Sequence, residues 1–415
     1  MIIRKIIKLA VIFSIIPSLY NSIYPGRIAI ASILCSYPIF VGIIYIINRL
    51  YVSRVSIARK FDGINYVYLF IIYNLIVLLR GLLDAQSIED WKSMFSNVLP
   101  LYLVTHFSLY IALYPSFVID TIRTFLTYGL LLCLLIYVIE PELSINFIKS
   151  LSPIYFIVLI IPYLDKKNSI FIITVAAVFF FSVFTNRANM LNIIIVFVIV
   201  STFIWRKKKW IFATIKTLRL ALLALPPVFL ILGLSGIFNV FLIGESLSWV
   251  VVDEKKESQD LLIDSRTAIY NDVFGELERQ DSFLFGLGAS GKTKTSLTDI
   301  SYADFDVIYK EGRRGTESGM LNYIQWGGII GGLLYFLLFI KASYLGVYKS
   351  KNWFCVMIGL WVAFKGMFSF IEDRNFFSIS TIFIFLAISV CMSKRFRSLT
   401  DYEIKSICNK HLKII

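Results

Sequence analysis

Cationic residues at the edges of long apolar runs are the side chains in this sequence best suited to chemistry. Two of them, Arg313 and Arg314, occur with Glu317 in Gly312-Arg-Arg-Gly-Thr-Glu-Ser-Gly319, directly before an apolar run. Arginine offers a planar fork of donors that matches phosphate oxygens. Cations and a carboxylate together at this position suit a lipid-linked phosphate substrate. A solvated turn is the alternative interpretation.

Four further cations, Arg80, Arg187, Lys365 and Arg374, border or enter apolar runs. Another, Arg266, lies in a long hydrophilic stretch, in Asp264-Ser-Arg-Thr-Ala-Ile-Tyr270. For those at the edge of a run, the alternative role is an interaction with lipid phosphates at the membrane surface. Lys365 lies deeper, and a central charge costs roughly 2.5 to 3.5 kcal/mol on insertion scales. We therefore expect Lys365 to face a polar cavity within a helical bundle.

A P-loop pattern occurs in Gly286-Leu-Gly-Ala-Ser-Gly291-Lys292-Thr293. The P-loop binds phosphates only within a strand, a following helix and the surrounding α/β sheet. The hydrophilic stretch that holds this pattern is too short to supply such a sheet. We interpret the match as chance, with the glycines serving a turn.

Metal and triad chemistry are disfavoured by the residue counts. The two histidines, His106 and His411, are far apart in sequence, and no Gly-x-Ser-x-Gly elbow occurs. Of the five cysteines, four fall in apolar runs and Cys408 lies in the basic C-terminal tail, so no disulfide framework is indicated. We expect no metal and no cofactor. Nucleic acid is not expected as a partner either, because the Lys and Arg residues flank apolar runs.

The elements that must position these residues are membrane-spanning helices. Of the 415 residues, 58% are hydrophobic and 16% charged, which is more apolar sequence than one soluble core could bury. Apolar runs of about twenty residues are long enough to cross a bilayer as helices. The sequence predicts an all-α polytopic membrane protein with about twelve spans, near 7–24, 28–48, 64–83, 97–115, 119–139, 150–164, 169–186, 190–205, 220–243, 320–340, 353–371 and 375–392.

The basic clusters of this chain predict its orientation. With the N-terminus inside, every strong cluster falls on the cytoplasmic side. These clusters are Arg49 to Lys60, Lys166 and Lys167, Arg206 to Lys209, Lys341 to Lys351, and Lys394 to Arg397. We divide the chain into nine spans (1–243), one large outward-facing loop (244–319), three spans (320–392) and a basic cytoplasmic tail (393–415). Short amphipathic helices are expected in the loop around Ser265 to Leu277.

The chain resembles the O-antigen polymerase and O-antigen ligase superfamily, whose members are membrane glycosyltransferases of GT-C-like architecture. The resemblance covers most of the chain in architecture, and its local motifs lie in one order. They are Asn186-Arg187 before a span, Ser265-Arg266-x-x-x-Tyr270, Phe285-Gly-Leu-Gly288, Glu317-Ser-Gly-Met-Leu-Asn322 and Gly327-Gly-Ile-Ile-Gly331. The resemblance implies a multi-pass protein of the bacterial inner membrane whose large loop is periplasmic.

The resemblance also implies a substrate and a mechanism. Undecaprenyl-pyrophosphate-linked oligosaccharides would be joined without a metal, with an acceptor hydroxyl attacking the anomeric carbon. Arg187 and Arg266 would bind the pyrophosphate, with Arg80, Arg313, Arg314, Lys365 and Arg374 as further substrate-binding candidates. Ligases of this superfamily typically carry a histidine where Glu317 stands. This difference favours a polymerase in lipopolysaccharide biosynthesis, with Glu317 as general base and Arg266 as the second catalytic candidate.

Two other functions stay open. An O-antigen ligase would transfer the finished polymer to the lipid A core. A flippase for lipid-linked oligosaccharides also has many spans and intramembrane charges, although such transporters usually show two similar halves. Besides the lipid-linked substrate and membrane lipid, a chain-length regulator is a candidate partner.

Overall fold

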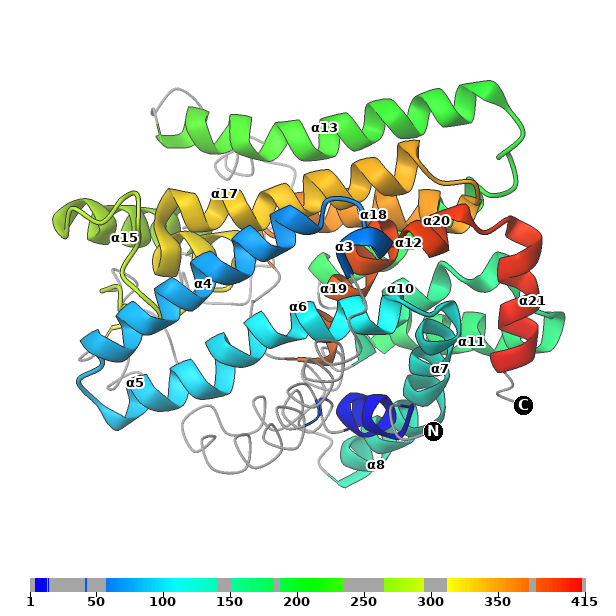
Figure 1. Ribbon diagram of the computed structural model, residues 1–415, viewed down its shortest axis with the longest axis horizontal. Helices are drawn as coiled ribbons and strands as arrows, with labels where there is room; N and C mark the ends of the chain where they lie inside the picture. The colour runs from blue at the N-terminus through cyan, green and yellow to red at the C-terminus, as the bar shows by residue number, and fades with distance from the viewer. Residues whose placement is uncertain are drawn as a thin grey trace, which may run out of the picture.

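A computed structural model describes residues 4–12, 14, 42, 57–139, 151–182, 187–234, 265–294, 312–372 and 378–412 of the chain (Figure 1). Within these residues the regular secondary structure is helical. The β pairing described consists of two isolated bridges, between Phe61 and Ser393 and between Thr293 and Arg313. The predicted all-α fold is therefore confirmed for this part of the chain.

Four stretches of helix are long and apolar enough to cross a membrane. They are α4 (Ile64–Asp84), the continuous run of α7 (Pro115–Thr124), the π-helix η2 (Phe125–Gly129) and α8 (Leu130–Ile139), then α13 (Lys209–Leu234), and α17 (Gly319–Tyr348). Large apolar residues such as Leu79 on α4 and Ile231 on α13 are exposed on the bundle surface. These features indicate a multi-pass membrane protein.

The remaining elements are shorter. They are α3 (Ile57–Lys60), α5 (Ile88–Ser93), the π-helix η1 (Met94–Val98), α6 (Leu99–Ala112), α10 (Ile154–Val158), the 3₁₀ turn η4 (Ile161–Tyr163), α11 (Lys166–Ser182), α12 (Arg187–Ser201), α15 (Ser265–Arg279), α18 (Trp353–Phe368), α19 (Ile379–Met392), α20 (Lys394–Ser398) and α21 (Asp401–His411). The helix expected around Ser265 to Leu277 is thus confirmed as α15.

One expectation needs correction. The predicted span at 150–164 contains only α10 and η4 joined by turns, with Pro153 and Pro162 in the segment, so it is not one continuous helix. The segment predicted as a basic tail at 393–415 contains α20 and α21, and Ile404 and Cys408 of α21 are buried. The predicted span at 28–48, and most of the one at 7–24, lie outside the described residues.

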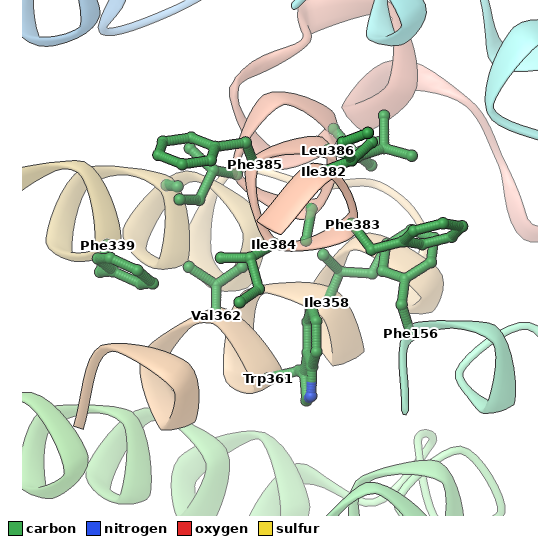
Figure 2. Packing of buried hydrophobic residues seen from close by; sticks show 14 of the residues in the cluster. Phe156, Phe339, Ile358, Trp361, Val362, Ile382, Phe383, Ile384, Phe385 and Leu386 are labelled. Carbon is green, nitrogen blue, oxygen red and sulfur yellow. The ribbon is translucent and has the colours of Figure 1, made fainter. Parts of the chain in front are cut away.

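The core of the bundle lies where α10, α17, α18 and α19 meet. Figure 2 shows Phe156 and Trp361 close to Phe383, with Phe339 on the opposite side of the same cluster. The ring of Phe156 packs edge-on against Trp361 and Phe383, with centroid distances of 5.9 and 5.6 Å. Such aromatic contacts add to the burial of large apolar surfaces. They fix α18 and α19 at the centre of the fold.

The longest helix, α17, is broken at Gly328. This residue has φ 66° and ψ −166°, a conformation that is accessible mainly to glycine. The ring of Tyr323 stacks on that of Tyr335 with a centroid distance of 4.1 Å. In a straight helix, residues twelve positions apart are separated by about 18 Å. The first arm, residues 319–327, therefore folds back against the second, residues 329–348.

Residues 283–288, which we call the strap, pair with the backbone groups that the break exposes. The amides of Leu287 and Gly288 donate to the carbonyls of Gln325 and Trp326, at 2.8 and 2.9 Å. The amide of Ile329 donates to the carbonyl of Phe283 at 3.0 Å. In a membrane each unsatisfied backbone group costs several kcal/mol. The strap is therefore what allows an apolar helix to break here.

Ion pairs join segments at two ends of the bundle, and Figure 1 shows α20 and α21 at one end and α5 and α15 at the other. At the end with α20 and α21, Asp62 pairs with Lys394 and Arg397, and Arg4 pairs with Asp120. At the end with α5 and α15, Asp90 pairs with Lys292 and Arg314. Each pairing joins residues that the charge pattern assigns to the same side of the membrane.

We predict that Gly328→Ala destabilises the protein strongly. An added Cβ would lie far inside contact distance of the Leu284 carbonyl, and the positive φ would be strained. The expected loss is roughly 2 kcal/mol or more, seen as a lower Tm of the purified protein in detergent. The matched control is Gly275→Ala on α15, where a Cβ meets nothing within 4 Å. Equal Tm values for the two variants would contradict the proposed role of the break.

We also predict that the two ends of the bundle face opposite sides of the membrane. Glu278→Cys on α15 should react with a membrane-impermeant maleimide in intact cells, because Glu278 is exposed at the α15 end. Tyr402→Cys should react only after permeabilisation, since Tyr402 is 82% exposed at the other end. Labelling of the unsubstituted chain, which has five native cysteines, measures the background. Labelling of both variants in intact cells would exclude this orientation.

Candidate functional site at the end of α18

The C-terminus of α18 is bound by the N-terminus of α17. A helix end leaves its last carbonyls without helical partners. Here the Ser318 hydroxyl donates to the carbonyl of Ser369 at 2.9 Å, and the amide of Met320 donates to the same carbonyl at 2.8 Å. Ser318 also caps α17 by accepting from the amide of Leu321. One serine therefore fixes two helix ends to each other.

Helix α15 docks on the same point through Tyr270. Its hydroxyl donates to the carbonyl of Phe370 at 2.6 Å and lies 3.5 Å from the Ser318 hydroxyl. Burial raises the pKa of Tyr270 to about 12, although the Ser318 hydroxyl lowers it slightly. The phenol is therefore neutral and remains a donor at physiological pH. We call Tyr270, Ser318, Ser369 and Phe370 the α18 junction.

Lys365 lies one helical turn before the α18 junction. Its side chain is buried, with 3% of the residue exposed, and its Nζ lies 3.3 Å from Oδ1 of Asn192 on α12. The rings of Phe368 and Tyr155 are 5.0 and 6.0 Å from the same nitrogen. A buried ammonium next to an amide oxygen and two ring faces lies in a polar niche of the bundle.

Arg187 and Arg266 lie on the helices that reach this niche. Arg187 is the first residue of α12, five residues before Asn192, which is a rise of about 7.5 Å along the helix. Arg266 is in the first turn of α15, four residues before Tyr270 and so about one turn from it. Glu317 directly precedes Ser318 and is exposed. Elements from four parts of the sequence thus meet at the end of α18.

Arg80 has a structural role at the strap. Its NH1 and NH2 groups donate to the carbonyls of Phe285 and Gly286, at 2.7 and 3.0 Å. The hydroxyl of Tyr73, two turns earlier on α4, donates to the carbonyl of Gly327. Helix α4 therefore holds both the strap and the break in α17. The guanidinium of Arg80 is occupied with backbone carbonyls rather than open to a ligand.

Asp90 binds two further cations at the same end. Its Oδ1 lies 3.0 Å from Lys292 Nζ and 2.9 Å from Arg314 Nε. Burial of Asp90 would raise its pKa, but hydrogen bonds from Lys292, Arg314 and Ser87 outweigh it and hold the pKa well below the ordinary value. The carboxylate stays charged at neutral pH. It fixes the loop segments around residues 292 and 314 to α5.

Arg313 takes part in this arrangement through its backbone. Its amide donates to the carbonyl of Thr293 at 2.7 Å, and its carbonyl accepts from the amide of Thr293 at 2.9 Å. The carbonyl also accepts from Nε2 of Gln325 at 3.1 Å. Of the predicted site residues, Arg80, Arg313 and Arg314 thus lie near the strap, whereas Lys365 and Glu317 lie near the α18 junction. Arg187 and Arg266 are placed only as members of the first turns of α12 and α15, which pack against α18 and α17. Arg374 lies outside the described residues.

The structure confirms that the P-loop pattern is a chance match. A P-loop uses free backbone amides and a free lysine to bind phosphates. Here the amides of Leu287, Gly288 and Ala289 already donate to backbone carbonyls, and Lys292 pairs with Asp90. Gly286 and Gly288 have φ of 71° and 77°, as turn glycines do.

Two residues of this region were missed by the sequence reasoning. Ser318 could have been predicted as a helix cap from the sequence, because serine is a favoured N-cap residue directly before a helix. Asn192 is an amide inside an apolar run, and only the packing of α12 against α18 shows that it faces Lys365. Intramembrane polar residues usually face the bundle interior, so Asn192 could have been selected on that ground.

The α18 junction can hold an anionic group next to an exposed carboxylate. Lys365 supplies a buried positive charge on α18, and the exposed Glu317 supplies an acceptor for a proton. Among the described residues, no three histidine, cysteine, aspartate or glutamate side chains gather closely enough to hold a metal ion. No protein-family model, curated protein or solved structure matches the chain.

We predict that Asp90→Asn lowers stability by about 2 kcal/mol at pH 7, because charged hydrogen bonds of the two cations are lost. The folded-state pKa of Asp90 is depressed, so its contribution is present above the unfolded value of about 3.9 and is lost as pH falls below it. The Tm difference between variant and parent should be constant from about pH 5 to pH 8 and should shrink near pH 4. Asp84→Asn, at an exposed position six residues earlier, is the control. A Tm unaffected by Asp90→Asn at pH 7 would refute this role.

Proposed function

We propose that this protein is a polymerase of surface polysaccharide, a membrane glycosyltransferase that joins lipid-pyrophosphate-linked oligosaccharide repeat units. The observation that carries the proposal is the buried ammonium of Lys365 beside Asn192, one helical turn before the α18 junction and near the exposed Glu317. Arg187 and Arg266 lie at the start of α12 and α15, which pack against α18 and α17, and would add their charges there. Three positive charges from separate helices are suited to a pyrophosphate, which carries several negative charges at neutral pH. The motif order described from the sequence supports the same class of substrate.

In the proposed reaction, a hydroxyl oxygen of the acceptor sugar forms a bond to the anomeric carbon of the donor. The bond between that carbon and the pyrophosphate oxygen breaks, and the configuration inverts. The lipid pyrophosphate leaves with the bonding electron pair, while Glu317 takes the proton of the hydroxyl. A guanidinium about 4 Å from a phosphate oxygen contributes roughly 4 kcal/mol at an effective dielectric of 20, and it contributes more as charge develops on the leaving group.

The location follows from the same proposal. The end of the bundle with α15 and the strap would face the periplasm, and the end with α20, α21 and both termini would face the cytoplasm. The protein would cross the inner membrane about twelve times, as the hydropathy pattern predicts. An undecaprenyl-pyrophosphate oligosaccharide would be donor and acceptor, and a chain-length regulator would be a partner.

The test is to delete the gene and compare surface polysaccharide ladders on a gel after complementation with variants. Arg266→Ala and Glu317→Gln should each reduce polymer by about a hundredfold or more, the loss expected when a transition-state contact is removed. Arg279→Ala and Glu278→Gln are matched controls, because both residues are exposed on α15 away from the α18 junction. Lys365→Met should keep or raise the amount of folded protein, because it removes a buried charge, while polymer is lost.

The pattern of products distinguishes the alternatives. A lipid core carrying a single repeat unit, with no ladder, supports the polymerase. A bare core with polymer accumulating on the carrier lipid would identify a ligase instead. Unpolymerised lipid-linked units retained on the cytoplasmic face would identify a flippase. An unchanged ladder in the deletion strain would refute all three.

A further inference from the structure

The second arm of α17 carries an open stripe on one face. Its members are exposed or half-buried, whereas most of the helix is buried, and they recur at intervals of three or four residues, which places them on one face. They are Leu333, Leu337, Ile340, Lys341, Tyr344 and Tyr348. Both α4 and α13 pack against α17, and Figure 1 shows α17 between them. The stripe is apolar as far as Ile340.

Three cations gather where this stripe ends. Lys216 and Arg219 come from α13, and Lys341 comes from α17. Lys216 Nζ lies 4.4 Å from the ring centroid of Phe212 and 5.2 Å from that of Tyr348. Lys341 Nζ lies 5.6 Å from the ring of Tyr66 on α4 and 5.8 Å from that of Tyr344. These cation–π contacts join α4, α13 and α17 around one positive centre.

Arg219 anchors this cation cluster of Lys216, Arg219 and Lys341. Its Nε donates to the Ser343 hydroxyl and its NH2 donates to the carbonyl of Ile340, both at 2.9 Å. Only 7% of Arg219 is exposed, and its guanidinium lies 5.7 and 5.5 Å from the rings of Tyr344 and Tyr348. The position of the guanidinium is therefore set before any ligand binds.

The charge of the cluster is not balanced by acidic side chains. Within the described part of the chain, no carboxylate lies at ion-pair distance from Lys216, Arg219 or Lys341. Three positive charges in a partly buried position attract an anion strongly, because solvent screens them less than it screens surface charges. Basic pockets between transmembrane helices bind anionic lipid headgroups in this way.

The length of the stripe indicates what kind of anion fits. From Leu333 to Lys341 the helix rises about 12 Å. One leaflet of the hydrocarbon core is about 15 Å thick, half of the whole. We propose that the cation cluster and the stripe of α17 bind an anionic phospholipid, with its phosphate at Lys216, Arg219 and Lys341 and an acyl chain along Leu333, Leu337 and Ile340.

A lipid in this position would connect α13 to the rest of the bundle. Helix α13 packs on α17 and α18 at the periphery, and much of its surface is exposed, with Leu220 at 63% and Ile231 at 66%. The headgroup would contact both α13 and α17, and the chain would fill the space along the open stripe. Binding should therefore stabilise the folded protein in proportion to lipid concentration.

The test is a Tm titration of the full-length protein, purified in a neutral detergent, with phosphatidylglycerol, phosphatidylcholine or soluble glycerol phosphate. Phosphatidylglycerol should raise Tm by several degrees, whereas the other two should not at the same concentration. Lys216→Gln/Lys341→Gln should weaken the apparent affinity for phosphatidylglycerol about thirtyfold, because each lysine near an anionic lipid contributes about fivefold.

The matched control is Lys405→Gln/Lys410→Gln, which makes the same charge change at exposed positions on α21. This control should titrate like the parent, and Lys216→Arg/Lys341→Arg should retain most of the affinity. If the glutamine pair does not fold, Lys341→Gln alone is measured, with about a fivefold weakening expected. Equal stabilisation by phosphatidylcholine, full stabilisation by glycerol phosphate, or an unchanged titration in the cluster variants would each overturn the proposal.

Discussion

A helix that breaks within an apolar bundle must find partners for the backbone groups that the break exposes. In this protein α17 breaks at Gly328, and the strap supplies those partners through Phe283, Leu287 and Gly288. The strap is held in turn by Arg80 on α4. Much of the end of the bundle near α15 therefore depends on one set of backbone hydrogen bonds, contributed by segments that are far apart in sequence.

The break also sets the position of the α18 junction. Because the first arm of α17 folds back, its N-terminus reaches the C-terminus of α18, where Ser318 binds the carbonyl of Ser369. Tyr270 then brings α15 to the same point. A straight α17 would carry Ser318 about 15 Å beyond the break along the helix axis. The meeting of α15, α17 and α18 at this point is thus a consequence of the fold of α17 rather than of any local motif.

The cations near the strap and those of the cation cluster differ in how their charges are compensated. At the strap, Lys292 and Arg314 share Asp90, so their charge is used to hold loops together. At the opposite end, Lys216, Arg219 and Lys341 are surrounded by aromatic rings and amide or hydroxyl oxygens. A carboxylate partner makes a cation structural, whereas ring faces leave most of its charge available to an anion.

The sequence alone determined the class of fold and the identity of the chemical groups. Apolar runs of about twenty residues require helices in a bilayer. For this reason α4, α13, α17 and α15 could be anticipated, although α13 begins eleven residues before its predicted span. Lys365 could be assigned to the bundle interior because a central charge is costly in lipid. These conclusions depend on local amino-acid composition, which can be read from a short segment of the sequence without knowing the rest of the fold.

Only the tertiary structure decided which cations act together. Arg80 and Arg187 are similar in sequence context, since each borders an apolar run. In the structure Arg80 donates to the carbonyls of Phe285 and Gly286. Arg187 is instead the first residue of α12, the helix that brings Asn192 to Lys365. Hydropathy alone also did not report the irregular segment around α10 or the break at Gly328, because it does not describe backbone geometry, although Pro153 and Pro162 are a local signal for the first of these. Contacts such as Tyr73 with Gly327 join residues more than 250 positions apart. Such pairs are fixed by how helices pack, and that depends on the whole chain at once.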